Sequence, residues 1–190
     1  MFTLQANPDT VSIWSWVFDP VVIGGLFIAG LLYYLAISSR RLQWFPDSEP
    51  ASRNRIIAFY LGLAAIFLAI ASPLDPLSDD YLLSAHMVQH ILLTLIAPPL
   101  VIAGIPPWMV APVTRRARVW RVWRVLTRPV MAFLLFHLPF ALSHVPPFYN
   151  LALENHAVHI LEHYVYISTA FLAWWVVVAP GREYGQLQSG

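Results

Sequence analysis

The chain has 190 residues, of which 58% are hydrophobic and 11% charged, and its mean hydropathy is +0.63. Soluble domains carry about a quarter charged residues, so the composition indicates a membrane protein, and the net charge of +1 gives no reason to expect a nucleic-acid partner. With no cysteine, disulfides, thiolate metal sites and dithiol redox chemistry are excluded, and any metal must be held by His, Met or carboxylate.

Five segments are long and apolar enough to cross a membrane. A transmembrane helix needs roughly 20 apolar residues to span a hydrocarbon core about 30 Å thick. The segments that meet this requirement are residues 20–39, 56–74, 81–104, 129–150 and 153–179. The first twenty residues hold no Lys or Arg, so a cleavable signal peptide is not expected. We predict an all-α integral membrane protein, a single domain over 1–190 built as a bundle of about five transmembrane helices.

The links between these segments alternate in charge. All basic residues are arginines, and the first link contains Arg40, Arg41, Arg53 and Arg55. The second link, "SPLDPLSDD", has no basic residue but contains Asp75, Asp79 and Asp80. The third link is again rich in arginine, the fourth has none, and the tail has Arg182. Because cytoplasmic links are enriched in arginine, we predict that the N-terminus is outside and the C-terminus inside.

The third link, "TRRARVWRVWRVLTR" at residues 114–128, is itself amphipathic. At about 100° per residue, one helix face carries only arginines and the other carries valine, tryptophan and leucine. The arginines of the first face are Arg118, Arg121, Arg124 and Arg128, and the apolar face is Val119, Trp120, Val122, Trp123 and Leu126. The pattern predicts an interfacial basic helix in the inner headgroup layer; a docking surface for a partner protein is the alternative.

All the histidines fall in the outer halves of the predicted spans. His86 and His90 enter with the third span, His144 ends the fourth, and the fifth begins with "HAVHILEH", which holds His156, His159 and His163. On a helix His86 and His90 share a face, and the three histidines of the fifth span form one narrow stripe. Such polar stripes at bilayer depth are functional-site candidates, and they predict one shared site between three helices. Interhelical hydrogen bonding is the alternative role, and we favour it for His137.

Six imidazoles without thiolate suit copper, zinc or iron. Met87 could add a thioether that favours Cu(I), and Glu162 borders the histidine stripe, where it could orient an imidazole. Asp75 and Asp79 are candidates for a cation-attracting entrance or for helix-start caps. Prolines 98, 99, 106 and 107 predict a kink or a broken end in the third span.

Two blocks of the chain, "HMVQHILLTLIAPPLVIAGIP" and "SHVPPFYNLALENHAVHILEHYVYISTAFLAWW", resemble the signature blocks of the multi-span CtaG-type cytochrome c oxidase assembly factors. The similarity covers most of residues 70–180. It implies a bacterial cytoplasmic membrane protein that assists haem–copper oxidase biogenesis by supplying copper. The matching motif histidines are His86, His90, His144, His156, His159 and His163.

We therefore expect a non-enzymatic assembly factor whose histidine cluster binds copper, most simply as Cu(I), on the periplasmic or extracellular side. Its expected partners are a haem–copper oxidase subunit and membrane lipids, and self-association is left open. The alternative is a b-type haem electron carrier with bis-His ligation, for example by His90 and His159. A di-iron desaturase is disfavoured because the histidines face out, and a metal permease because the inner halves of the spans hold almost no polar residues.

Overall fold

The computed structural model describes residues 16–46, 48–80, 82–114 and 116–178, and this part of the chain is helical throughout its regular elements. The long elements are α1 (Pro20–Ile37), α3 (Arg53–Ala71), α9 (Pro129–Ser143) and α11 (His156–Val178). A further span is continuous over α5 (Leu83–Ile91), the π-helical turn η2 (Leu92–Ile96) and α6 (Ala97–Gly104). Shorter helices are α2 (Arg41–Trp44), α4 (Leu74–Asp80), α7 (Pro107–Thr114), α8 (Ala117–Leu126) and α10 (Pro146–Glu154).

Four helical stretches of the described chain are long and apolar enough to cross a membrane, and a bent pair makes a fifth. The four are Pro20–Ile37, Arg53–Ala71, Leu83–Gly104 and Ala157–Val178. The pair is α8 with α9, which meet at 63°. The prediction of an all-α membrane protein with about five spans is confirmed.

The fourth span ends, and the fifth span begins, at other residues than predicted, for local reasons. The fourth was predicted to reach residue 150, but α9 ends at Ser143 and Pro146 begins the separate helix α10. Proline cannot continue a helix but is well suited to its first turn. Asn155 has an extended backbone conformation and ends α10. Its side-chain oxygen accepts hydrogen bonds from the backbone N–H groups of Ala157 and Val158 at 3.0 and 3.4 Å. This cap starts α11 and separates it from α10.

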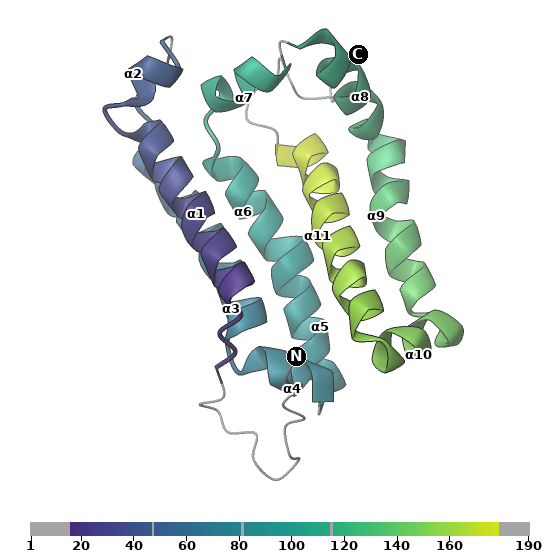
Figure 1. Cartoon of the computed structure of the whole chain (residues 1–190). Helices are drawn as coiled ribbons and strands as arrows, with labels where there is room; N and C mark the ends of the chain where they lie inside the picture. Colours follow the sequence, from purple (N-terminus) through teal and green to yellow (C-terminus); the bar gives the residue numbers. More distant parts are fainter. Residues whose placement is uncertain (1–15, 47, 81, 115, 179–190) are drawn as a thin grey trace.

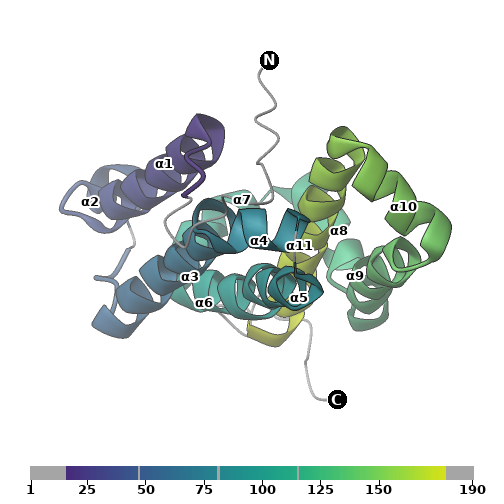
Figure 2. The ribbon, with the colours of Figure 1, turned by 90° about the horizontal axis from the view of Figure 1, so that it is seen from below.

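The spans do not pack in chain order. α1 packs on α3, α3 packs on the α5–η2–α6 span, and α11 lies between that span and α9 (Figure 1). The view from below shows the same neighbours, with α10 joining α9 to α11 (Figure 2). The last span of the described chain therefore lies directly beside α5, the helix that carries His86 and His90.

The most extensive helix contact joins α3 to α6 and depends on two glycines. A Cβ added at Gly104 would lie 2.6 Å from the backbone nitrogen of Phe59, and one added at Gly62 would lie 2.5 Å from Cγ2 of Val101. Small residues allow this close approach of two membrane helices, where packing rather than water release drives association. Tyr33 stacks on Phe59 and donates a hydrogen bond to the Gly104 carbonyl at 2.8 Å, so α1 is fixed to the same contact.

Arg55 of α3 caps the end of α6. Its Nη1 donates to the carbonyl oxygens of Ala103 and Ile105, at 3.0 Å each. These carbonyls belong to the last turn of α6, where the helix dipole favours a cation. The bond fixes the register of α6 against α3.

The π-helical turn η2 ends at Ile96, two residues before the prolines Pro98 and Pro99 begin. These residues lack the N–H groups that would bond to the carbonyls one turn earlier, including that of Thr94. Trp174 of α11 supplies the missing donor, because its Nε1 bonds to the Thr94 carbonyl at 2.8 Å. The predicted kink is thus a change of helix pitch, and the freed carbonyl attaches α11 to the span.

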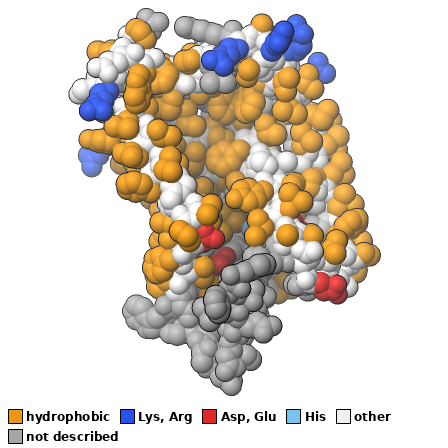
Figure 3. All heavy atoms as spheres, viewed as in Figure 1, with side chains coloured by type: hydrophobic (Ala, Val, Ile, Leu, Met, Phe, Trp, Pro, Cys, Tyr) orange, Lys and Arg blue, Asp and Glu red, His pale blue; other side chains and the backbone are white. Residues whose placement is uncertain are grey.

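Charge is segregated along the bundle. The described arginines lie in α2, in α8, in the first turn of α3 or in the segments next to α2 and α8, and Figure 3 shows basic side chains gathered at that end of the molecule. The acidic side chains visible on this face lie nearer the opposite end, where α5 and α11 begin (Figures 1 and 3).

Candidate metal centre

Four histidines from two facing helices come together at the end of the bundle opposite the arginines. His86 and His90 lie on α5, and His159 and His163 lie in the first two turns of α11. His86 and His159 are three and two residues inside the candidate spans that begin at Leu83 and Ala157, and His90 and His163 lie one turn deeper. We call these four residues the histidine cluster.

The imidazole rings of the cluster are close neighbours. The ring centroids of His86 and His90 are 4.3 Å apart, and those of His159 and His163 are 4.5 Å apart. Across the helix interface, His90 stacks on His163 at 5.3 Å, while His86 lies 6.2 Å from His159 and 6.4 Å from His163. Two residues separated by three or four positions share a helix face, so each helix presents a pair and the interface joins the pairs.

His90 is the buried centre of the cluster. It is 5% exposed, its Nε2 lies 2.7 Å from Nε2 of His86, and its Nδ1 is buried without a hydrogen-bond partner. A buried ring nitrogen without a partner is costly in a purely structural role. Thr94 bonds to the His90 backbone carbonyl at 2.6 Å, so the π-helical turn also supports this residue.

Gln89 sets the rotation of α5 that turns His86 and His90 toward α11. It is 1% exposed, and its Nε2 donates to the Ala69 carbonyl at 3.1 Å and to Oδ1 of Asp75 at 2.8 Å. Its Oε1 accepts a hydrogen bond from Ser78 at 3.0 Å. These bonds attach α5 to α3 and α4, and a buried polar network satisfied in this way specifies one packing.

Tyr166 closes the deep side of the cluster. Its ring is 2% exposed, lies 5.3 Å from that of His90, and its hydroxyl donates to Glu162 at 2.5 Å. Glu162 was predicted to orient an imidazole; in the structure it accepts a hydrogen bond from Tyr166, which itself packs against His90. Phe140 of α9 lies 5.4 Å from Tyr166 and 6.0 Å from His90, so α9 covers the same side.

The remaining predicted residues lie at different distances from the cluster. His144 is exposed at the end of α9 and bonds through Nδ1 to the Phe140 carbonyl at 2.7 Å; the Phe140 ring lies 4.7 Å from that of His144 and 6.0 Å from that of His90. His137 bonds to the Phe133 carbonyl of its own helix at 3.0 Å, on an exposed face. Met87 is half-buried, and Asp75 contributes to the Gln89 network. The side chains of His156 and Asp79 lie outside the described residues, so their predicted roles stay predictions.

Imidazoles are ligands for copper, zinc or iron, but the rings of the cluster do not form a ready metal site as they stand. Among the described residues, no three His, Asp or Glu side chains converge on one position as they stand. A metal–nitrogen bond of about 2.0 Å places the ring centroids of two imidazole ligands about 5 to 6 Å apart and their nitrogens at least about 3.3 Å apart. The cluster centroids lie 4.3–6.4 Å apart and the closest nitrogens 2.7 Å apart. An opening of less than about 1 Å between His86 and His90 would therefore admit an ion.

Three residues that the sequence interpretation did not single out support the site. Tyr166 could have been found, because it lies seven positions after His159 and three after His163 and so falls on the same helix stripe. Trp174 lies further along that stripe. Gln89 lies three positions after His86 and so borders the histidine face of α5, but nothing in its spacing shows that it would be buried against α3 and α4.

Comparisons with known proteins identify the family of the chain. The family model for the cytochrome c oxidase caa3 assembly factor matches residues 31–190. Uncharacterized proteins of Mycobacterium bovis and Mycobacterium tuberculosis are each 24% identical to the chain over 194 residues, which is 92% of this chain and 29% of theirs. The chain thus spans less than a third of the length of these relatives, and no solved structure matches it. The chain belongs to the cytochrome c oxidase caa3 assembly factor family.

Proposed function

We propose that this protein assists the assembly of haem–copper cytochrome c oxidase by binding copper at the histidine cluster and supplying it to a nascent oxidase subunit. Family membership supports the oxidase part of the proposal. The observation that carries the copper part is the approach of three imidazoles: the Nε2 atoms of His86 and His90 face each other at 2.7 Å, and the ring of His163 stacks on that of buried His90.

The arrangement suits a copper ion that is passed on to another protein better than a permanently bound cofactor. Each helix provides an imidazole pair, and imidazoles without carboxylate or thiolate leave copper with neutral ligands that exchange readily. His86, His159 and His163 are half-buried, whereas His90 is buried, so the cluster has an accessible side from which an ion could enter and leave. His144 and His156 are proposed as additional ligands along that route, as the motif suggests.

The proposed side of the membrane follows from the charges. The arginine end of the bundle is expected to face the cytoplasm, because cytoplasmic links are enriched in arginine. The histidine cluster lies toward the opposite end and would then face the periplasm or the extracellular space (Figure 1). We propose no catalytic step, in keeping with an assembly role.

The packing favours copper over haem. A bis-His haem needs a flat macrocycle between two axial imidazoles. Here the rings of His90 and His163 stack directly on each other at 5.3 Å, and Tyr166 packs against the same ring of His90. A porphyrin would have to separate α5 from α11 along their contact.

The proposal is tested by complementation of a bacterial strain that lacks this protein. Oxidase would be purified from strains carrying the wild type, His90→Ala/His163→Ala, or His137→Ala as a matched control from outside the cluster, and its copper and haem contents measured. We expect the wild type and H137A to restore copper and the double variant to leave the oxidase copper-deficient while it retains haem. Full copper in the oxidase from the double variant, at equal protein level, would refute the role of the cluster.

A further inference from the structure

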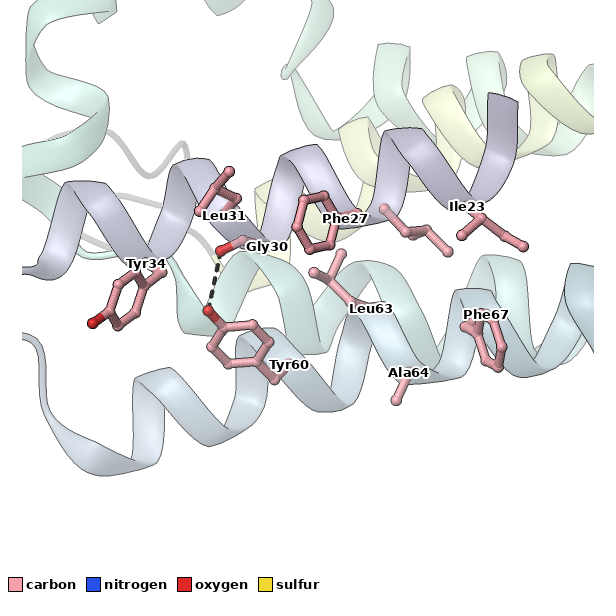
Figure 4. A pocket seen from close by; sticks show the side chains of 10 residues that line it. Ile23, Phe27, Gly30, Leu31, Tyr34, Tyr60, Leu63, Ala64 and Phe67 are labelled. Atoms are coloured by element: carbon pink, nitrogen blue, oxygen red, sulfur yellow. Dashed lines mark hydrogen bonds between the residues drawn. The ribbon is translucent and has the colours of Figure 1, made fainter. Parts of the chain in front are cut away.

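α1 and α3 leave an apolar groove of about 480 Å³ between them, remote from the histidine cluster. Figure 4 shows side chains of both helices lining it, and its walls include Ile23, Phe27 and Tyr34 from α1 and Tyr60, Ala64 and Phe67 from α3. The Tyr60 hydroxyl donates to the Gly30 carbonyl at 3.0 Å, which joins the two helices across the groove (Figure 4). The groove is therefore a fixed feature of the α1–α3 contact.

The length and the apolar lining of the groove suit an acyl chain. From Ile23 to Tyr34 it extends about 16 Å at ~1.5 Å per residue, close to the depth of one leaflet, which is about 15 Å. A single hydrocarbon chain could lie along the groove over this depth.

One end of the groove is basic. Arg53 lies seven residues before Tyr60, hence on the same face of α3 and about 10 Å nearer the arginine end. Arg41 begins α2, which follows and contacts α1, and its Nε is buried without a hydrogen-bond acceptor. The opposite end of α1 is capped by an acidic residue, Asp19. A buried guanidinium donor without an acceptor indicates a missing anion, and phosphate is a favourable one.

We propose that the α1–α3 groove binds an anionic phospholipid of the membrane. One acyl chain lies in the groove, and the phosphate lies against Arg41 and Arg53. The lipid fills the gap beside α1, which among the long helices packs chiefly on α3. This site is independent of the histidine cluster and of the proposed copper function.

The test is photo-crosslinking in reconstituted vesicles. The full chain would be incorporated into phosphatidylcholine vesicles that contain a diazirine-labelled acyl chain on either phosphatidylglycerol or phosphatidylcholine, and the labelled peptides mapped by mass spectrometry. We expect phosphatidylglycerol to label the α1 and α3 peptides, and R41Q/R53Q to reduce this labelling about tenfold or more, since each basic residue near the surface adds substantially to anionic lipid binding.

Matched variants separate this site from general lipid contact. R118Q/R121Q removes two exposed arginines from α8 at the same end of the bundle and is expected to leave α1–α3 labelling unchanged. A64F fills the groove and should abolish labelling, whereas A141F adds the same ring to an exposed position of α9 and should not. The proposal would be overturned if the two lipids labelled the α1 and α3 peptides equally, or if R41Q/R53Q left this labelling unchanged. It would also be overturned if a bound polypeptide protected the groove from labelling.

Discussion

Replacing Gln89 by leucine should destabilise the protein and weaken the histidine cluster without touching a histidine. Leucine matches the buried volume but removes three hydrogen bonds: two to Ala69 and Asp75 at 3.1 and 2.8 Å, and one from Ser78 at 3.0 Å. Interhelical hydrogen bonds in membranes contribute about 0.6 kcal/mol each, and in water neutral bonds contribute about 1 kcal/mol and charge-assisted bonds about twice that. We expect the free energy of unfolding to fall by about 2 to 4 kcal/mol.

The assay is reversible unfolding of the detergent-solubilised protein by increasing SDS fraction, with copper retention measured on the folded fraction. Gln43→Leu is the matched control, because Gln43 is exposed in α2 and its replacement should change stability by less than about 0.5 kcal/mol. Copper retention should fall in Q89L although every imidazole is present. If Q89L unfolds at the same SDS fraction as Q43L, or retains as much copper as the wild type, the network does not set the orientation of α5.

Three further predictions concern the packing and the membrane orientation. Gly104→Ala places a Cβ 2.6 Å from the backbone of α3. It should lower the free energy of unfolding by about 1 to 3 kcal/mol in the same SDS titration. Unchanged stability would mean that the two helices are free to separate. Trp174→Phe removes the donor to the Thr94 carbonyl, and we expect a loss of about 1 kcal/mol and faster hydrogen exchange around the π-helical turn, where equal exchange would argue against the bond. Because the chain has no cysteine, single cysteines introduced at Asn150 and Ser39 report topology: a membrane-impermeant maleimide should label the first in intact cells and the second only after lysis, and the reverse pattern would invert the predicted orientation.

The sequence contains enough information for the membrane fold and for the histidine stripes. Long apolar segments must form helices in lipid because every backbone group has to be satisfied within the segment. Residues three or four apart on such a helix share a face whatever the rest of the fold, so His86 with His90 and His159 with His163 could be paired in advance. The two histidine pairs then face each other between α5 and α11 provided that both polar stripes are turned away from lipid.

Other features depend on contacts between segments distant in the chain. Gln89 is buried because α4 folds over it, and the sequence interpretation treated that segment as an outer loop with three aspartates. Prolines 98, 99, 106 and 107 predicted a kink or a broken end in the third span, and α6 ends at Gly104 just before the second pair. The π-helical turn before the first pair, and the donor that Trp174 supplies to it from another helix, could not be predicted from the prolines alone. Likewise, nothing in the local pattern of α9 shows that the Phe140 ring would pack near both His144 and His90.

The measurement that tests the central claim most directly is the copper content and visible absorption of the detergent-purified protein after loading with Cu(I) under reducing conditions. It would be made on the wild type, on His86→Ala/His90→Ala/His159→Ala, and on His137→Ala as control. The account predicts about one copper or more per chain in the wild type and in H137A, loss of copper in the triple variant, and no Soret band. Equal and negligible copper in all three proteins, or a Soret band in the wild type, would contradict it.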